Sequence, residues 1–145
     1  MAKPRLDISD LISSPKPKTL DLIVADGSCL QIRQLLSTAQ VPVLWLDDQE
    51  PPLETVSRAL AERKLLMQPV ATLHWVSHGS PGRLHIGATQ INSNTLLVNA
   101  HHLASWGIGS LALWSCHAGA DPDFIALLQE LTGSSVWSSG HALDM

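Results

Sequence analysis

Short apolar runs alternate with amphipathic segments along most of this chain. The runs are too short to be helices, and nearly every position in them is apolar, which is typical of strands buried on both faces of a parallel sheet. Strand–helix alternation of this kind predicts an α/β fold, a three-layer sandwich whose mainly parallel sheet carries helices on both faces. The expected strands are 20–25, 41–46, 70–77, 110–115 and 134–138.

Polar caps and prolines indicate where the intervening helices begin. Ser28, with Gln31 three residues later, is typical of a capping box, and Asp121 is an N-cap followed by proline at the first helical position. A small β-hairpin, 83–87 against 89–91, is expected after the turn that follows His78. The four helices are expected to start at Ser28, Pro51, Asn92 and Asp121.

The chain fits a single domain. Residues 1–19 contain three prolines and no apolar period, so we expect a flexible N-terminal lead-in followed by one domain over 20–145. An apolar content of 45% and a charged content of 15% are typical of a globular protein. The net charge of −4, with the basic residues scattered, argues against nucleic-acid binding.

Several compartment signals are missing from the sequence. No apolar stretch marks an N-terminal signal peptide, and no run approaches the ~18 apolar residues of a membrane span. Two cysteines are too few for a disulfide framework. We therefore expect a soluble protein, either cytoplasmic or exported by a route that needs no signal peptide.

The side chains capable of chemistry stand at the carboxyl ends of the expected strands. His78 follows the run 70–77, and Cys116 follows the run 110–115. In an open parallel sheet, ligands bind in the crevice outside these strand ends. One rim should therefore bring His78 and Cys116 together. The other positions expected on this rim, as substrate-binding candidates, are Asp26, Asp47, Ser77, His117, Ser138 and Ser139.

Cys116 and His78 are residue types that can act as a nucleophile and its general base. A thiol with a pKa of about 8.5 is only a few per cent ionised near neutrality, and a neighbouring imidazole can take its proton and return it to a leaving group. Gly79 allows close approach of a substrate, and its N–H could stabilise an oxyanion. The structural alternative is a small core cysteine and a hydrogen-bonded histidine.

Other residues near this rim have purely structural interpretations. Asp26, Asp47 and Asp48 follow strands, where aspartate commonly forms turns and caps. The alternative is an acidic rim that orients His78 or receives a basic side chain of a substrate. Trp75 and Trp114 fall at matched positions in neighbouring strands, where we expect them to pack against helices.

The seven histidines raise the question of a metal site. His74 and His78 are four residues apart in a strand, hence roughly 13 Å apart by strand rise, too far to share one ion. Cys116 and His117 are adjacent, which is poor chelating geometry. No nucleotide-binding loop or serine-hydrolase motif is present. We therefore expect neither a metal nor a cofactor.

An apolar strand ending in Ser77-His78-Gly79, followed by an apolar strand ending in Ser115-Cys116, resembles the caspase-like cysteine peptidases. In that group, the histidine and the cysteine end adjacent parallel strands and form a dyad. The resemblance implies that His78 is the general base, Gly79 an oxyanion-side backbone and Cys116 the nucleophile. The implied substrate is a peptide or protein.

The segments 22–26, 43–47, 76–82 and 128–133 are similar to the bacterial domain of unknown function numbered 4347. That domain usually lies near the N-terminus of very large secreted repeat proteins and adhesins. Its pattern has a cysteine where Cys116 stands, commonly followed by asparagine, whereas this chain has His117. Ser138 to His141 also replace the serine and acidic residues usual at that place.

Two classes of function follow from these residues and resemblances. The first is a cysteine endopeptidase that uses a Cys116–His78 dyad and acts on its own parent chain or on a surface-protein partner. The second is a non-catalytic domain of the same fold that serves the secretion, assembly or adhesion of a larger protein.

Overall fold

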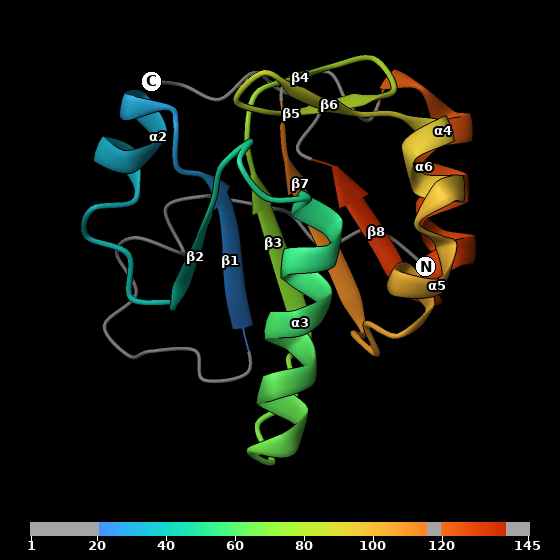
Figure 1. The fold of residues 1–145 in the computed structure, drawn as a ribbon, viewed down its shortest axis with the longest axis horizontal. Coiled ribbons are helices and arrows are strands. Elements are labelled where there is room, and N and C mark those ends of the chain that lie inside the picture. The colour runs from blue at the N-terminus through green and yellow to red at the C-terminus, as the bar shows by residue number, and fades with distance from the viewer. Residues whose placement is uncertain (1–20, 116–119, 139–145) are drawn as a thin grey trace.

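A five-stranded parallel sheet forms the centre of the fold (Figure 1). The structure is a computed structural model that describes residues 21–115 and 120–138. The strand order is β2-β1-β3-β7-β8, and every neighbouring pair is parallel. The strands are β1 (Asp21–Asp26), β2 (Val43–Leu46), β3 (Thr72–Val76), β7 (Ser110–Trp114) and β8 (Ser135–Ser138).

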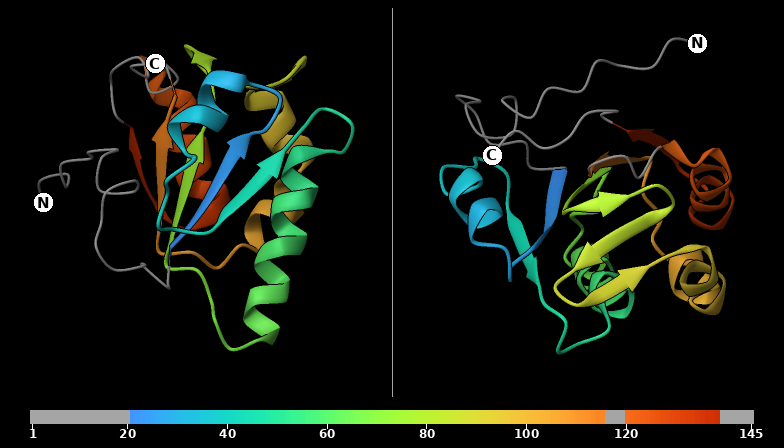
Figure 2. Two further views of the ribbon diagram at one scale, coloured as in Figure 1. Left: turned by 90° about the vertical axis from the view of Figure 1, so that its left-hand side faces the viewer. Right: turned by 90° about the horizontal axis from the view of Figure 1, so that it is seen from above.

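Helices cover both faces of this sheet, as the strand–helix alternation predicts (Figure 2). One face, here named the α3 face, packs against four helices: α3 (Pro52–Leu65), α4 (Ser93–Val98), α5 (Ala100–Ala104) and α6 (Pro122–Thr132). The opposite face, named the α2 face, packs against α2 (Leu30–Leu35). The α/β three-layer prediction is confirmed.

Each central strand divides its side chains between the two faces, because successive residues of a strand point in opposite directions. In β3, Leu73 and Trp75 belong to the core of the α3 face, whereas Val76 belongs to the core of the α2 face. All three are at most 1% exposed, so the strand is buried on both sides. Such burial explains why these strands read as continuous apolar runs.

The core of the α3 face includes two fully buried aromatic side chains besides Trp75 (Trp106 and Phe124). A buried indole N–H needs an acceptor, and Trp106 Nε1 donates to Ser57 Oγ of α3 at 2.7 Å. Ser57 in turn donates to the backbone oxygen of Leu53 at 2.9 Å. The buried polar atoms between α3 and the end of α5 are thereby satisfied.

A small antiparallel sheet lies across the carboxyl ends of the central strands (Figure 2, right). It consists of β4 (Gly79–Ser80), β5 (Arg83–Ile86) and β6 (Thr89–Ile91). The predicted hairpin is thus confirmed, and β4 extends it. The turn between β4 and β5 contains Pro81 and Gly82, and Gly82 has φ +71°, which suits glycine after proline in a type II turn.

The structure corrects three local expectations. Cys29, not Ser28, is the N-cap of α2, and the Ser28 hydroxyl donates to Asp26 instead. The helix expected to start at Asn92 does start there, with a capping box, but is divided into α4 and α5. Trp75 and Trp114 are not matched: Trp114 pairs with Val76, so the two indoles lie on opposite faces. The predicted lead-in over 1–19 lies outside the described residues.

Helix α3 ends in a turn whose left-handed residue is not glycine. The N–H of Gln68 donates to the oxygen of Arg63 at 2.8 Å, and the N–H of Met67 donates to the oxygen of Lys64 at 3.0 Å. These two bonds define a Schellman motif, whose left-handed residue is usually glycine. Here that residue is Met67, with φ +60°. A side chain in this conformation costs roughly 1–2 kcal/mol.

We expect Met67→Gly to stabilise the protein, by roughly 0.5–1 kcal/mol once the greater freedom of glycine in the unfolded chain is subtracted. Leu66→Gly, one residue earlier at φ −85°, relieves nothing and should destabilise. Urea unfolding of both variants measures the difference. Destabilisation by Met67→Gly would show that the methionine side chain has favourable contacts outweighing its backbone strain.

Candidate functional site

His78 lies at the carboxyl end of the central strand β3, two residues beyond its last position. It is half-buried, and Gly79 directly after it begins β4. The backbone oxygen of His78 accepts a hydrogen bond from the N–H of His85 at 2.9 Å. His78 is therefore held between the main sheet and the small sheet.

A buried pair of serine hydroxyls joins the chain just before His78 to the chain just before Cys116. Ser77 Oγ lies 3.3 Å from Ser115 Oγ, and both side chains are fully buried. Ser77 Oγ accepts from Trp75 Nε1 at 3.0 Å and donates to the oxygen of His78 at 2.9 Å. Because a hydroxyl has only one proton, Ser115 is left as the donor to Ser77.

A second contact joins these two parts of the chain beyond Cys116. Asp121, the N-cap of α6, lies against the turn of the small sheet: a Cβ added at Gly82 would come 2.6 Å from its Oδ2. The stretch 116–119, which contains Cys116 and His117, lies outside the described residues. Its two flanks, Ser115 and Asp121, therefore both contact the segment that runs from Ser77 to Gly82.

The N–H of Gly79 is not used by the ladder of the small sheet. Gly79 is paired with Leu84, and the flanking bond runs from the N–H of His85 to the oxygen of His78. In an antiparallel pair this arrangement makes Gly79 and Leu84 a non-hydrogen-bonded pair. Both backbone groups of Gly79 consequently point away from β5.

Two aspartates at strand ends hold the turn between β5 and β6. Asp26, which is 5% exposed, accepts from the N–H of Gly87 at 3.1 Å, and Asp48 accepts from the N–H of Ala88 at 2.8 Å. The Ala88 hydrogen bond keeps the pKa of Asp48 below its usual range. Asp47 accepts from the N–H of Gln49 at 2.9 Å, which is turn chemistry.

Ser138 lies at the carboxyl end of β8, next to β7 in the sheet. Its hydroxyl oxygen is buried and, among the residues that the structure describes, has no hydrogen-bond partner. Ser139, the neighbouring candidate, lies outside the described residues.

The sequence interpretation missed a buried chain of polar groups on the α2 face. Trp114 Nε1 donates to His74 Nδ1 at 3.1 Å, and His74 Nε2 lies 3.1 Å from Asp21 Oδ2. Because the indole can only donate, Nδ1 must be the acceptor, and Nε2 carries the proton toward Asp21. His74 is thereby given a structural partner at each ring nitrogen. The sequence alone does not reveal the register of β3 with β7, which brings Trp114 to the same face as His74.

The described segments, 21–115 and 120–138, contain neither a metal-binding cluster nor a membrane-spanning helix. No three histidine, cysteine or acidic side chains in them lie close enough together to hold a metal ion. None of their helices has the length and the apolar character needed to cross a membrane.

The fold and rim together define an α/β domain whose polar groups gather at the carboxyl ends of a parallel sheet. The model of one protein family, the domain of unknown function DUF4347, matches residues 22–143. The chain therefore belongs to this family, as the resemblance of its strand-end motifs predicts. No curated protein of known function matches the chain.

The anchoring of the hairpin turn by Asp48 should depend on pH. A carboxylate with a lowered pKa stabilises its partner above its usual pKa of about 4 and loses this effect as the pH falls through the lowered value. We expect Asp48→Asn to speed hydrogen exchange at Ala88 at neutral pH. In the wild type, the Ala88 amide should lose protection from exchange below about pH 4, after correction for the intrinsic pH dependence of exchange. In Asp48→Asn the protection of this amide should not change over the same pH range.

Asp47→Asn is the matched control, because Asp47 bonds only to its own turn among the described residues. Its substitution should leave exchange at Ala88 unchanged. If Asp47→Asn and Asp48→Asn had equal effects, the specific contact between β2 and the hairpin would be refuted.

Proposed function

We propose that this chain is a cysteine peptidase domain of the caspase-like type, with Cys116 as nucleophile and His78 as general base. The observation that carries the proposal is the Ser77–Ser115 pair, since these residues directly precede His78 and Cys116 and their hydroxyl oxygens are 3.3 Å apart. The substrate is a peptide bond in the parent chain or in a surface-protein partner.

The proposed reaction assigns one role to each group. His78 takes the proton of Cys116, and the thiolate attacks the scissile carbonyl carbon to form a tetrahedral oxyanion. The N–H of Gly79, unused by the small sheet, donates to that oxyanion. Collapse expels the amine, which receives the proton from His78, and leaves a thioester. Water then hydrolyses the thioester, with His78 accepting its proton, and restores the thiol.

Two features of the described residues support the location of this chemistry. The hairpin turn held by Asp26 lies at the end of β1, next to the point where the strand order reverses, so we place the substrate toward β3 and β7. Ser138, on the strand next to β7, offers a buried hydroxyl to a substrate. The carboxylate of Asp26 already accepts a hydrogen bond from the turn, so Asp26 is not the acidic partner of His78 in the proposed reaction.

The same occupation of Asp26 favours the second candidate, a non-catalytic domain that serves the secretion, assembly or adhesion of a larger protein. With the crevice beside β1 filled by the hairpin turn, the fold can be fully stable without a substrate channel at that position. The two candidates differ in the reactivity of Cys116, which an alkylation experiment measures directly.

We expect iodoacetamide at neutral pH to label Cys116 about tenfold or more faster than Cys29, because an imidazole at hydrogen-bond distance raises the thiolate fraction. His78→Ala should remove this difference and leave Cys29 unchanged. Peptide mapping by mass spectrometry gives both rates in one sample, so Cys29, a partly buried free thiol, serves as the internal control.

Ser115→Ala provides a graded test, since it removes the hydroxyl pair but neither reacting group. Its labelling of Cys116 should fall between the wild-type and His78→Ala rates. Labelling of Cys116 at the Cys29 rate, unaffected by either substitution, would contradict the dyad and leave the non-catalytic domain. Cleavage of a longer parent chain by the wild type, and none by Cys116→Ala, would identify the substrate.

A further inference from the structure

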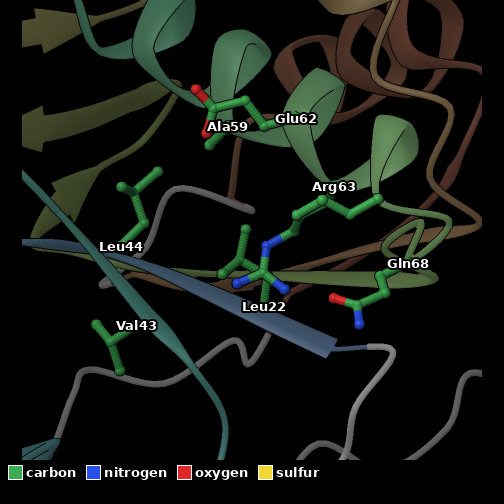
Figure 3. A pocket seen from close by; sticks show the side chains of 8 residues that line it. Leu22, Val43, Leu44, Ala59, Glu62, Arg63 and Gln68 are labelled. Atoms are coloured by element: carbon green, nitrogen blue, oxygen red, sulfur yellow. The ribbon is translucent and has the colours of Figure 1, made fainter.

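A groove separates helix α3 from the edge strand β2. It has a volume of about 330 Å³ (Figure 3). Its apolar lining comes from Leu22 of β1, Val43 and Leu44 of β2 and Ala59 of α3. A smaller hollow of about 170 Å³ continues it along α3 and shares Leu44, Ala59 and Glu62. The groove therefore follows the edge of the sheet.

A cation projects into this groove. Figure 3 shows the guanidinium of Arg63 reaching from α3 across the pocket, with the amide of Gln68 on the same side and the carboxylate of Glu62 directed away. Arg63 is half-buried, and within the described residues no carboxylate lies within 4 Å of it. A guanidinium over an apolar floor suits a ligand that combines a carboxylate with aliphatic groups.

The edge strand β2, which lies beside the groove, has backbone N–H and C=O groups that no described strand pairs with. Among the described residues β2 has one strand neighbour, β1. The oxygens of Pro42 and Leu46 accept from β1, so the alternate residues Val43 and Trp45 direct their N–H and C=O groups toward the open edge. No charged residue lies within β2 to guard it, and such an edge can pair with an added strand.

The end of α3 adds apolar surface at the mouth of the groove. Leu65, Leu66 and Met67 are 84%, 68% and 86% exposed, and Leu66 also lines the pocket. Met67 has φ +60°, and the turn it makes places Gln68 beside Arg63 in the pocket lining. Backbone strain of this kind is concentrated at binding sites in proteins.

We propose that the groove between β2 and α3 binds an extended segment of a partner protein that carries apolar residues two positions before and after an acidic one, so that all three side chains lie on the same face of the added strand. The segment adds as a strand to Val43 and Trp45, its apolar side chains cover Leu44, and its carboxylate pairs with Arg63. Charge complementarity selects this occupant, because the guanidinium of Arg63 reaches across the groove and has no carboxylate partner among the described residues, whereas the carboxylate of Glu62, also in the lining, points away from that guanidinium. The site is independent of the Cys116–His78 pair.

The test uses the full chain and two blocked peptides, acetyl-Leu-Thr-Asp-Thr-Leu-amide and its analogue with asparagine in place of aspartate. Calorimetry should show binding of the acidic peptide and about tenfold or more weaker binding of the analogue. Arg63→Gln should weaken the acidic peptide by a similar factor. Arg83→Gln is the control, since Arg83 bonds to Gln90 on the small sheet, and should bind as the wild type does.

Hydrogen exchange gives a second readout that does not depend on charge. The acidic peptide should slow exchange at Val43 and Trp45, the amides directed to the open edge. Equal binding of the two peptides, no effect of Arg63→Gln, no protection at these amides or no binding at about 1 mM would each overturn the proposal. Concentration-dependent dimerisation abolished by Leu66→Asp would identify a second copy as the occupant and would also overturn it.

Discussion

The parallel register of β3 with β7 is the constraint on which the candidate site depends. Val76 pairs with Trp114, and since parallel strands advance together, the next residues, Ser77 and Ser115, meet as a buried hydroxyl pair. The chain leaves both strands from this point. A shift of one residue would turn every side chain of β7 to the opposite face and separate the two hydroxyls. The apolar core of both faces therefore determines the geometry of the rim.

The same register explains what the sequence could and could not predict. Continuous apolar runs predict the five parallel strands, because burial on both faces is a local property of each strand. The partner of each polar residue is a long-range property. Trp114 was expected beside Trp75, yet it lies on the other face with His74, and Ser28, expected to cap α2, bonds to Asp26 instead. Pairing between distant segments decides these contacts, and local spacing does not encode it.

The small sheet changes the accessibility of the rim. In an open parallel sheet the crevice lies where the strand order reverses, here between β1 and β3. The turn at Gly87 and Ala88 lies at the neighbouring strand ends, held by Asp26 from β1 and by Asp48 beyond β2. Acidic residues that resemble a catalytic rim in the sequence thus have a structural use.

The rim and the groove beside β2 differ in how far the fold satisfies their residues. At the rim, the hydroxyls of Ser77 and Ser115 and the strand-end carboxylates have partners within the domain, so their geometry is determined by the fold. At the groove, strain at Met67 and the exposure of Leu66 are retained although simple substitutions could remove them. A partner that covered Leu66 would remove its exposed apolar surface from water, which is the driving force that the proposed binding at the groove requires.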